Sequence, residues 1–240
     1  MKYKGIIFDL DGVICSTDEY HYLAWKALAD QLGIEFDRQI NNRLRGVSRM
    51  ESLEIVLEKS DKDYSNAEKA QFAEVKNALY RELLGQMSPA DLSDEVRDTL
   101  NALRQKGLAL AIGSSSKNTP FILERIGLAG FFDAVSDGNN ITHSKPDPEV
   151  FLKAAQMLGL APADCLVVED AHAGVQAAVA GGFDCAAMGD AEDDPQATWH
   201  LGTFSDILMI RQPTPTGRLA GSAAPEGKDA DNHDILKAVI

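Results

Sequence analysis

The sequence predicts an α/β protein: a doubly wound, Rossmann-like parallel sheet with an all-helical cap domain inserted after its first strand. Three observations favour this class. Short apolar runs alternate with segments of helical spacing, which is typical of parallel sheets. Three of the apolar runs end in residues that can do chemistry, namely Asp9, Ser114 and the pair Glu169–Asp170. Residues 17–88 interrupt the alternation with helical patterns alone.

The core strands are predicted from continuous apolar runs, as expected for strands buried on both faces of a sheet. These runs cover residues 5–8, 108–113 and 166–168, and two further short strands are expected at 132–135 and 184–188. Helices are predicted over 94–106, 118–126 and 148–158. The last of these helices is expected to have Asp147 as its N-cap and Pro148 at its first position.

Ligands of open α/β folds bind beyond the carboxyl ends of the strands, which meet at one edge of the sheet. We therefore expect Asp9, Ser114 and Asp170 to converge there. Asp9 and Asp11 stand one residue apart directly after the first strand. Paired carboxylates suit Mg²⁺, and one of them can act as a nucleophile. An acidic turn after a strand is the simpler interpretation of this pair taken alone.

The insertion is predicted to contain four helices, over 19–32, 37–44, 49–59 and 65 to about 84. Ser65 and Glu68 give the fourth helix the spacing of a capping box. We expect the insertion to cover the edge of the sheet, an ordinary helical extension being the alternative. The predicted domains are a core of 1–16 and 89–212 and a cap of 17–88. The stretch 213–240, rich in Pro, Gly and small residues, is expected to be a disordered tail.

Composition narrows the possible partners and compartments. The net charge of −14 argues against a nucleic-acid-binding surface, so an anionic substrate must be attracted by local positive charge. Three scattered cysteines, Cys15, Cys165 and Cys185, favour buried thiols in a reducing compartment. The apolar run before Asp9 is too short for a signal peptide, and no stretch suits a membrane span. We expect a cytoplasmic protein, working as a monomer, without membrane or nucleic-acid partners.

Four segments of the chain, taken in order, resemble the four motifs of the haloacid dehalogenase-like superfamily of aspartyl-phosphate enzymes. Asp9-Leu10-Asp11-Gly12 matches the first motif, Ser114 the second, Lys145 the third and Glu169–Asp170 the fourth. The insertion resembles the helical cap of the phosphoglucomutase and phosphatase members. The closer resemblance, over roughly residues 1–190, is to the β-phosphoglucomutases. It is carried by Thr17, by 19–21 and 24–28, by 46–49 and by 114–118.

The resemblance implies that Asp9 is the nucleophile that becomes phosphorylated, and that Asp11 is the general acid and base. It also implies Mg²⁺ as cofactor, held by Asp9, by Asp170 and by the backbone carbonyl of Asp11. Glu169 is expected to support this metal site, a solvated acid at a helix start being the alternative.

Four further residues are expected to assist the transfer. The resemblance implies that Lys145 contacts Asp9 and the transferring phosphate, and that Ser114 donates a hydrogen bond to the same phosphate. It places Thr17 at the hinge of the cap. It gives His21 a part in closing the cap and in positioning Asp11, whereas packing is the alternative for a lone helical histidine.

A phosphomutase must also hold a second, non-reacting phosphate, which needs its own cationic site. The candidate substrate-binding residues are Trp25, Arg45, Gly46, Val47, Ser48, Arg49, Lys76, Ser115, Ser116, Lys117 and Asn118. For Arg45 and Lys76 a solvated helix charge is the alternative, and for Trp25 it is the core of the cap.

The implied reaction interconverts β-D-glucose 1-phosphate and D-glucose 6-phosphate through phosphorylated Asp9 and β-glucose 1,6-bisphosphate. The choice of the β anomer rests on the resemblance alone. A Mg²⁺-dependent sugar-phosphate phosphatase on the same framework is the alternative. A non-catalytic binding protein is disfavoured because Asp9, Asp11, Lys145 and Asp170 are all present.

Overall fold

The computed structural model describes residues 3–210, and the tail predicted at 213–240 lies outside them. Its centre is a six-stranded sheet in the order β3-β2-β1-β4-β5-β6, with every neighbouring pair parallel. The strands are β1 (Gly5–Phe8), β2 (Ala109–Gly113), β3 (Ala134–Ser136), β4 (Cys165–Glu169), β5 (Asp184–Ala187) and β6 (Trp199–His200). The predicted α/β class is confirmed, although β6 is not among the predicted strands.

Strand β1 lies between β2 and β4, at the point where the strand order reverses. Phe8 is aligned with Ile112 of β2 and with Val168 of β4, so the next residues of the three strands reach the edge together. This is the switch point at which open α/β sheets bind their ligands. The expected convergence of Asp9, Ser114 and Asp170 follows from this register.

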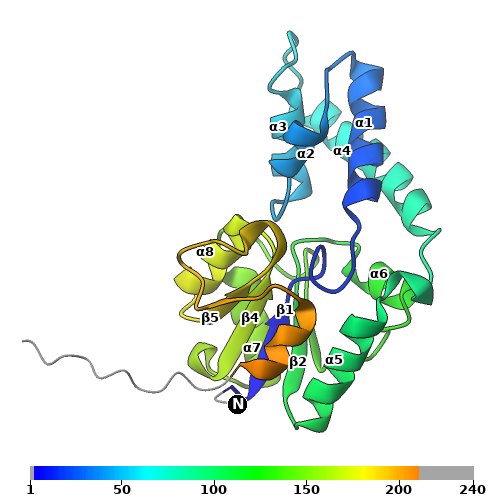
Figure 1. Ribbon diagram of the computed structural model, residues 1–240. Helices are drawn as coiled ribbons and strands as arrows, with labels where there is room; N and C mark the ends of the chain where they lie inside the picture. The colour runs from blue at the N-terminus through cyan, green and yellow to red at the C-terminus, as the bar shows by residue number, and fades with distance from the viewer. Residues whose placement is uncertain (1–2, 211–240) are drawn as a thin grey trace, which may run out of the picture.

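Helices cover both faces of the sheet (Figure 1). Ile6 and Phe8 belong to the apolar cluster formed with α5 (Asp94–Gln105), α6 (Thr119–Arg125) and the 3₁₀ helix η4 (Phe204–Met209). Ile7 belongs to the opposite cluster, formed with α7 (Glu149–Leu158) and α8 (His172–Ala180). The alternation along β1 therefore explains why the whole segment is apolar.

The insertion forms the four predicted helices: α1 (Asp18–Leu32), α2 (Arg38–Asn42), α3 (Arg49–Leu57) and α4 (Asn66–Leu84). They stand beyond the carboxyl edge of the sheet (Figure 1) and have a core of their own, which includes Trp25 and Leu53. The predicted capping box is present, because Ser65 accepts from the backbone of Glu68 and Glu68 from that of Ser65. These contacts define where α4 begins.

Several boundaries differ from the predictions by one or a few residues. Helix α7 begins at Glu149 with Pro148 as its N-cap, so the prediction of Asp147 as N-cap and Pro148 as first helical residue was wrong by one position. The side chain of Asp147 nevertheless accepts from the backbone N–H of Glu149 at 2.9 Å. Three short 3₁₀ helices connect other elements: η1 (Pro89–Asp91), η2 (Pro162–Asp164) and η3 (Gly189–Ala191). Among residues 3–210, no helix combines the length and the apolar character needed to span a bilayer.

The three cysteines are free and buried, as expected. Burial raises the pKa of Cys165 to about 11, so its thiol stays protonated at neutral pH. These thiols are packing residues of the core rather than reactive groups.

Candidate active site

A cavity of about 480 Å³ lies between the cap and the carboxyl edge of the sheet. All of the site residues put forward from the sequence line it. The core contributes Asp9, Asp11, Ser114 to Asn118, Lys145, Glu169 and Asp170, and the cap contributes Thr17, His21, Trp25, Arg45 to Arg49 and Lys76. The volume is that of a small-molecule site. Cap and core therefore share one binding site.

Lys145 is the buried cation of the core half of this site. Its Nζ lies 2.5 Å from Oδ1 of Asp9 and 2.5 Å from Oε1 of Glu169, and the residue is 1% exposed. Burial by itself would lower the pKa of Lys145, but the two carboxylates outweigh it and the pKa is raised. The lysine therefore remains charged and links the nucleophile candidate to the fourth motif.

Three carboxylates gather around this lysine. Oxygens of Asp9, Glu169 and Asp170 lie within 4.8 Å of one another. Burial, together with the charges of Glu169 and Asp9, raises the pKa of Asp170 to about 9. One lysine cannot balance three carboxylates, and such an oxygen-rich, anionic cluster is the donor set that hard divalent cations prefer.

Both oxygens of Glu169 are already engaged by the protein. Oε1 contacts Lys145, and Oε2 accepts the backbone N–H groups of Asp170 and Ala171, each at 2.9 Å. Asp9 and Asp170 are left to face the cavity with fewer internal contacts. Glu169 is therefore placed to hold the Lys145 side chain and the backbone of Asp170 in position.

Gly12, the last residue of the first motif, stands at a position that only glycine can occupy without strain. Its φ is +82°, and a Cβ at this position would lie 1.9 Å from Oδ2 of Asp170. Any other residue would collide with that carboxylate and would be strained in the left-handed region. The glycine therefore allows the loop that carries Asp11 to pass directly beside Asp170.

Asp11 is held by a chain of hydroxyl groups from the cap. Thr17 Oγ1 donates a hydrogen bond to Oδ1 of Asp11, and the Tyr80 hydroxyl donates to Thr17 Oγ1 at 3.0 Å. Burial, together with the charge of Asp9, raises the pKa of Asp11 to about 7. A carboxyl group with this pKa can both give and accept a proton near neutral pH.

Lys76 and His21 form a buried pair in the cap. Their side-chain nitrogens, Nζ and Nδ1, lie 2.9 Å apart, and Lys76 Nζ stands 4.7 Å from the ring centre of Trp25 and 4.3 Å from that of Tyr80. Burial, together with the charge of Lys76, lowers the pKa of His21 well below its usual value. His21 is therefore neutral and accepts from Lys76. Trp25 is 1% exposed and packs in the cap core.

Arg49 is one of three cationic side chains that the cap contributes to the cavity, with Arg45 and Lys76. It begins α3, which Ser48 opens with a capping box, and its Nη1 lies 3.1 Å from Oε1 of Glu74 on α4. Burial lowers the pKa of Arg49. Because the ordinary pKa of a guanidinium is very high, the side chain stays charged.

The loop after β2 reaches toward helix α4 of the cap. The Asn118 amide donates to Oδ1 of Asn77 at 3.0 Å and accepts from Arg81 at 3.0 Å. The backbone N–H of Ser116 donates to Ser114 Oγ at 3.2 Å, which gives this turn its shape. Asn118 is thus tied to the cap as well as placed at the cavity.

Two further contacts join cap and core. Arg45 forms ion pairs with Asp18, at 3.3 Å, and with Asp190 of η3. Ser115 Oγ donates to the backbone carbonyl of Gly46 at 3.3 Å. Arg45 is therefore engaged by carboxylates on both sides of the cleft instead of being a solvated helix charge.

Sequence reasoning missed several cavity residues on the inner face of α4. Glu74, Asn77 and Tyr80 line the cavity together with Lys76. Their spacing of three and four residues was the signal that places them on one helix face. Asn41 was also missed: it lines the cavity and donates to Asp18 Oδ1 at 3.0 Å. Within the described residues its buried Oδ1 has no hydrogen-bond partner.

Comparisons with known proteins identify the family. The family model of haloacid dehalogenase-like hydrolases matches residues 3–182. The chain is 42% identical over 208 residues to a β-phosphoglucomutase of Bacillus subtilis, covering 86% of this chain and 92% of that protein. It is 33% identical over 183 residues to the fructose-1-phosphate phosphatase YqaB of Escherichia coli, covering 76% and 95%.

A solved structure agrees with these matches. The β-phosphoglucomutase of Clostridium difficile superimposes with a TM-score of 0.81 at 34% identity, covering 85% of this chain and 93% of that one. The shared architecture extends over cap and core together. The chain belongs to the haloacid dehalogenase-like hydrolase family.

Proposed function

We propose that this protein is a Mg²⁺-dependent phosphomutase that interconverts β-D-glucose 1-phosphate and D-glucose 6-phosphate in the cytoplasm, working as a monomer. The observation that carries the proposal is one cavity with a cation in each half, Lys145 beside Asp9 in the core and Arg49 in the cap. A bisphosphate needs both positions, whereas a phosphatase needs one. The 42% identity to a β-phosphoglucomutase supports the same reaction.

Asp9 is the proposed nucleophile. Its carboxylate oxygen attacks the phosphorus of the bound bisphosphate, a P–O bond to Asp9 forms, and the P–O bond to the sugar breaks. The sugar oxygen takes a proton from Asp11, which the Thr17 hydroxyl holds in place. In the reverse step Asp11 removes that proton again. Lys145, and Ser114 at the edge of the sheet, hold the transferring group in line.

The cation proposed for this site is Mg²⁺. Asp9, Asp170 and the backbone carbonyl of Asp11 would hold it, with Glu169 keeping Lys145 and the Asp170 backbone in place. When bound, Mg²⁺ supplies positive charge to the oxygens of the transferring phosphoryl group. The observation that supports this fit is the excess of carboxylate over lysine charge in the cluster.

The cap is proposed to decide between a sugar hydroxyl and water. A phosphorylated aspartate is hydrolysed wherever water reaches it, so closure around the substrate protects it. Arg49, Ser116, Lys117 and Asn118 are proposed to bind the non-reacting phosphate, and the backbone of Gly46 and Val47 to contact the sugar. Substrate binding would thereby join cap to core.

The alternative is a sugar-phosphate phosphatase that uses Asp9, Asp11, Lys145 and Asp170 in the same way but admits water. The 33% identity to a fructose-1-phosphate phosphatase supports this alternative. The four motifs shared across the superfamily do not distinguish the two, because both reactions proceed through a phosphorylated aspartate.

A paired assay tests the proposal. β-Glucose 1-phosphate, Mg²⁺ and a trace of glucose 1,6-bisphosphate are supplied, and glucose 6-phosphate and free phosphate are followed together, with α-glucose 1-phosphate as control. Glucose 6-phosphate formed from the β anomer alone, with little free phosphate, supports the mutase. Free phosphate released in step with substrate loss would make the protein a phosphatase.

A further inference from the structure

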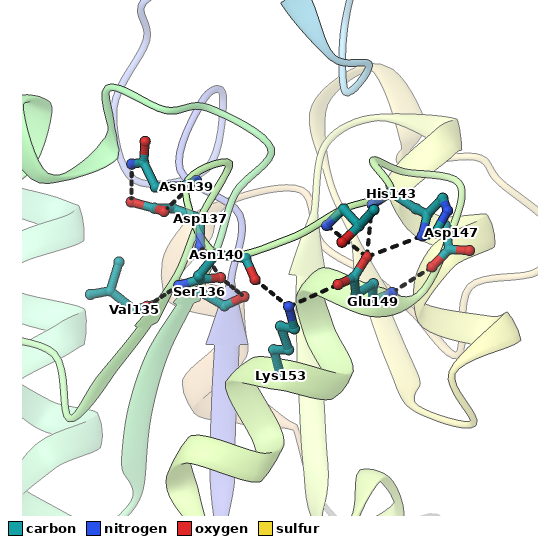
Figure 2. A network of polar contacts seen from close by, with 10 residues as sticks. Val135, Ser136, Asp137, Asn139, Asn140, His143, Asp147, Glu149 and Lys153 are labelled. Atoms are coloured by element: carbon teal, nitrogen blue, oxygen red, sulfur yellow. Dashed lines mark hydrogen bonds and ion pairs between the residues drawn. The ribbon is translucent and has the colours of Figure 1, made fainter.

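The loop between β3 and α7 carries Lys145 to the cavity. Gly138, Ile141, Thr142 and Ser144 of the same loop also line the cavity. Figure 2 shows a polar network that joins this loop to the end of β3 and to the first turns of α7. None of the hydrogen bonds drawn in this network involves Lys145, Asp9 or Glu169. The network therefore takes no direct part in the proposed phosphoryl transfer.

Glu149, the first residue of α7, binds the loop from below. Its Oε2 accepts the backbone N–H groups of Thr142, at 2.9 Å, and of His143, at 2.7 Å, and the His143 ring nitrogen Nδ1 lies 3.3 Å away (Figure 2). Hydrogen bonds from backbone N–H groups to an ionised carboxylate are stronger than those between neutral groups. The turn at 142–143 is therefore fixed two residues before Lys145.

Lys153, one turn further along α7, joins this carboxylate to the other end of the loop. Its Nζ lies 2.8 Å from Oε1 of Glu149 and donates to the backbone carbonyl of Asn140. The Asn140 side chain in turn accepts from Ser136 Oγ at 3.1 Å and from the backbone N–H of Asp137 at 3.2 Å. The loop is thus attached to α7 at one side and to the end of β3 at the other (Figure 2).

His143, Asp147 and Glu149 also have potential ligand atoms within 4.8 Å of one another. A cation site is not the better interpretation, because both oxygens of Glu149 are occupied by Lys153 and by backbone N–H groups. Asp147 is likewise bonded to the backbone of Glu149. The cluster therefore has the contacts of a structural clamp.

We propose that Glu149, with Lys153, is a positioning residue of the reaction: it holds the loop so that Lys145 reaches both Asp9 and Glu169. This inference rests on the proposed function of Lys145 in phosphoryl transfer. Lys145 Nζ lies 2.5 Å from each of its two carboxylate partners, so a small shift of the loop breaks both contacts. A displacement of about 1 Å in such a site can cost on the order of 100-fold in rate.

Glu149→Gln is the first variant, because it keeps the size of the side chain and removes the charge. It retains one acceptor oxygen but turns an amide group toward the loop or toward Lys153. Lys153→Met is the second variant and removes the bond to Asn140. Glu95→Gln is the matched control: Glu95 lies in the first turn of α5 and accepts the backbone N–H of Ser205 at 3.0 Å, in the core but outside the cavity lining.

The experiment has two readouts. The first is the acetylation rate of Lys145 by acetic anhydride, followed by peptide mass spectrometry, which does not depend on any activity. The second is kcat and KM for β-glucose 1-phosphate, with Tm measured on every variant. We expect Glu149→Gln to acetylate Lys145 several-fold faster and to lose about tenfold in kcat with KM within twofold. Lys153→Met should change both readouts in the same direction, and Glu95→Gln should change neither.

Wild-type acetylation of Lys145 in Glu149→Gln and Lys153→Met would overturn the inference. So would a loss of kcat that Glu95→Gln reproduces with an equal fall in Tm, because the effect would then be general stability. If acetylation rises in both variants but the wild-type protein does not isomerise β-glucose 1-phosphate, the positioning of Lys145 is supported and the proposed function fails. The two claims are thereby separated.

Discussion

Arg49 and Glu74 form an ion pair across the two cap helices α3 and α4, with Arg49 Nη1 3.1 Å from Glu74 Oε1. The Arg49 side chain is 22% exposed and that of Glu74 is 74% exposed. The guanidinium proposed to hold the non-reacting phosphate is therefore already paired with a carboxylate at the cavity. A substrate phosphate must compete with Glu74 for Arg49.

Glu74→Gln should tighten the binding of sugar phosphates. The substitution removes both the competitor for Arg49 and a negative charge that repels the phosphate. Because Glu74 is largely exposed, the pair is worth at most about 1 kcal/mol, so we expect KM to fall about two- to fivefold. Steady-state kinetics at low and high salt measure the effect, which should shrink as salt screens the charges.

Glu54→Gln is the control for this prediction. Glu54 pairs with Lys69 across the same two helices, at 2.7 Å. It should leave KM unchanged. An unchanged or higher KM in Glu74→Gln would show that Glu74 does not compete with the substrate.

Asp190→Asn should increase hydrolysis relative to isomerisation. Asp190, in the core, pairs with Arg45 of the cap, and loss of this pair favours a more open cap. The pair is partly exposed and contributes about 1 kcal/mol or less, so the ratio of free phosphate to glucose 6-phosphate should rise by up to about fivefold. The exposed Asp193 gives the control variant Asp193→Asn. Equal ratios in both variants and in the wild type would contradict a closing role for the pair.

Lys76→Met should stabilise the protein and impair substrate binding. Burial, together with the charge of Arg49, lowers the pKa of Lys76 well below its ordinary value of 10.5. At neutral pH the unfolded chain therefore holds this proton more tightly than the folded protein, and the charge costs stability. Replacing a buried charge by an apolar side chain is often worth about 1–4 kcal/mol, and each kcal/mol shifts Tm by about 2–4 °C in a protein of this size.

The pH dependence of this gain follows from the same pKa shift. As pH rises toward 10.5, Lys76 of the unfolded chain also loses its proton, so the advantage of methionine must shrink. Thermal melts at pH 7 and pH 9.5 measure it, with Lys69→Met as the control in the same helix. A lower Tm for Lys76→Met at pH 7 would mean that the cation–ring contacts with Trp25 and Tyr80 outweigh the cost of burial.

Asp11→Asn should slow transfer to sugar hydroxyls by about 10²–10⁴-fold, the usual contribution of a general acid and base. The asparagine keeps the shape and can still accept from Thr17, so the fold and Tm should hold. Rapid-quench measurement of phosphoryl transfer from Asp9 to glucose 6-phosphate gives the rate. A wild-type rate would exclude Asp11 as the acid and base.

Much of the core half of the site could be predicted from the sequence. Asp9, Ser114 and Asp170 each follow an apolar run, and parallel strands bring such positions to one edge whatever connects them. The capping boxes of Ser48 and Ser65 are local, so Ser65 and Glu68 were sufficient to place the start of α4.

The contacts between cap and core could not be predicted. Arg45 meets Asp190, 145 residues later, only because of the angle at which the cap stands over the sheet. Asn118 of the core meets Asn77 and Arg81 of α4 for the same reason. The local pattern around Pro148 indicated a helix start but not that Glu149 reaches back to the loop.

The central claim is that phosphorylated Asp9 gives its group to a sugar hydroxyl in preference to water. It is tested by labelling Asp9 with a radioactive acyl phosphate in the presence of Mg²⁺, locating the label by peptide mapping, and mixing the phosphoenzyme with β-glucose 1-phosphate. We expect the label to leave faster with the sugar than without it and to appear on glucose bisphosphate. Label released as inorganic phosphate at the same rate with and without sugar would contradict it.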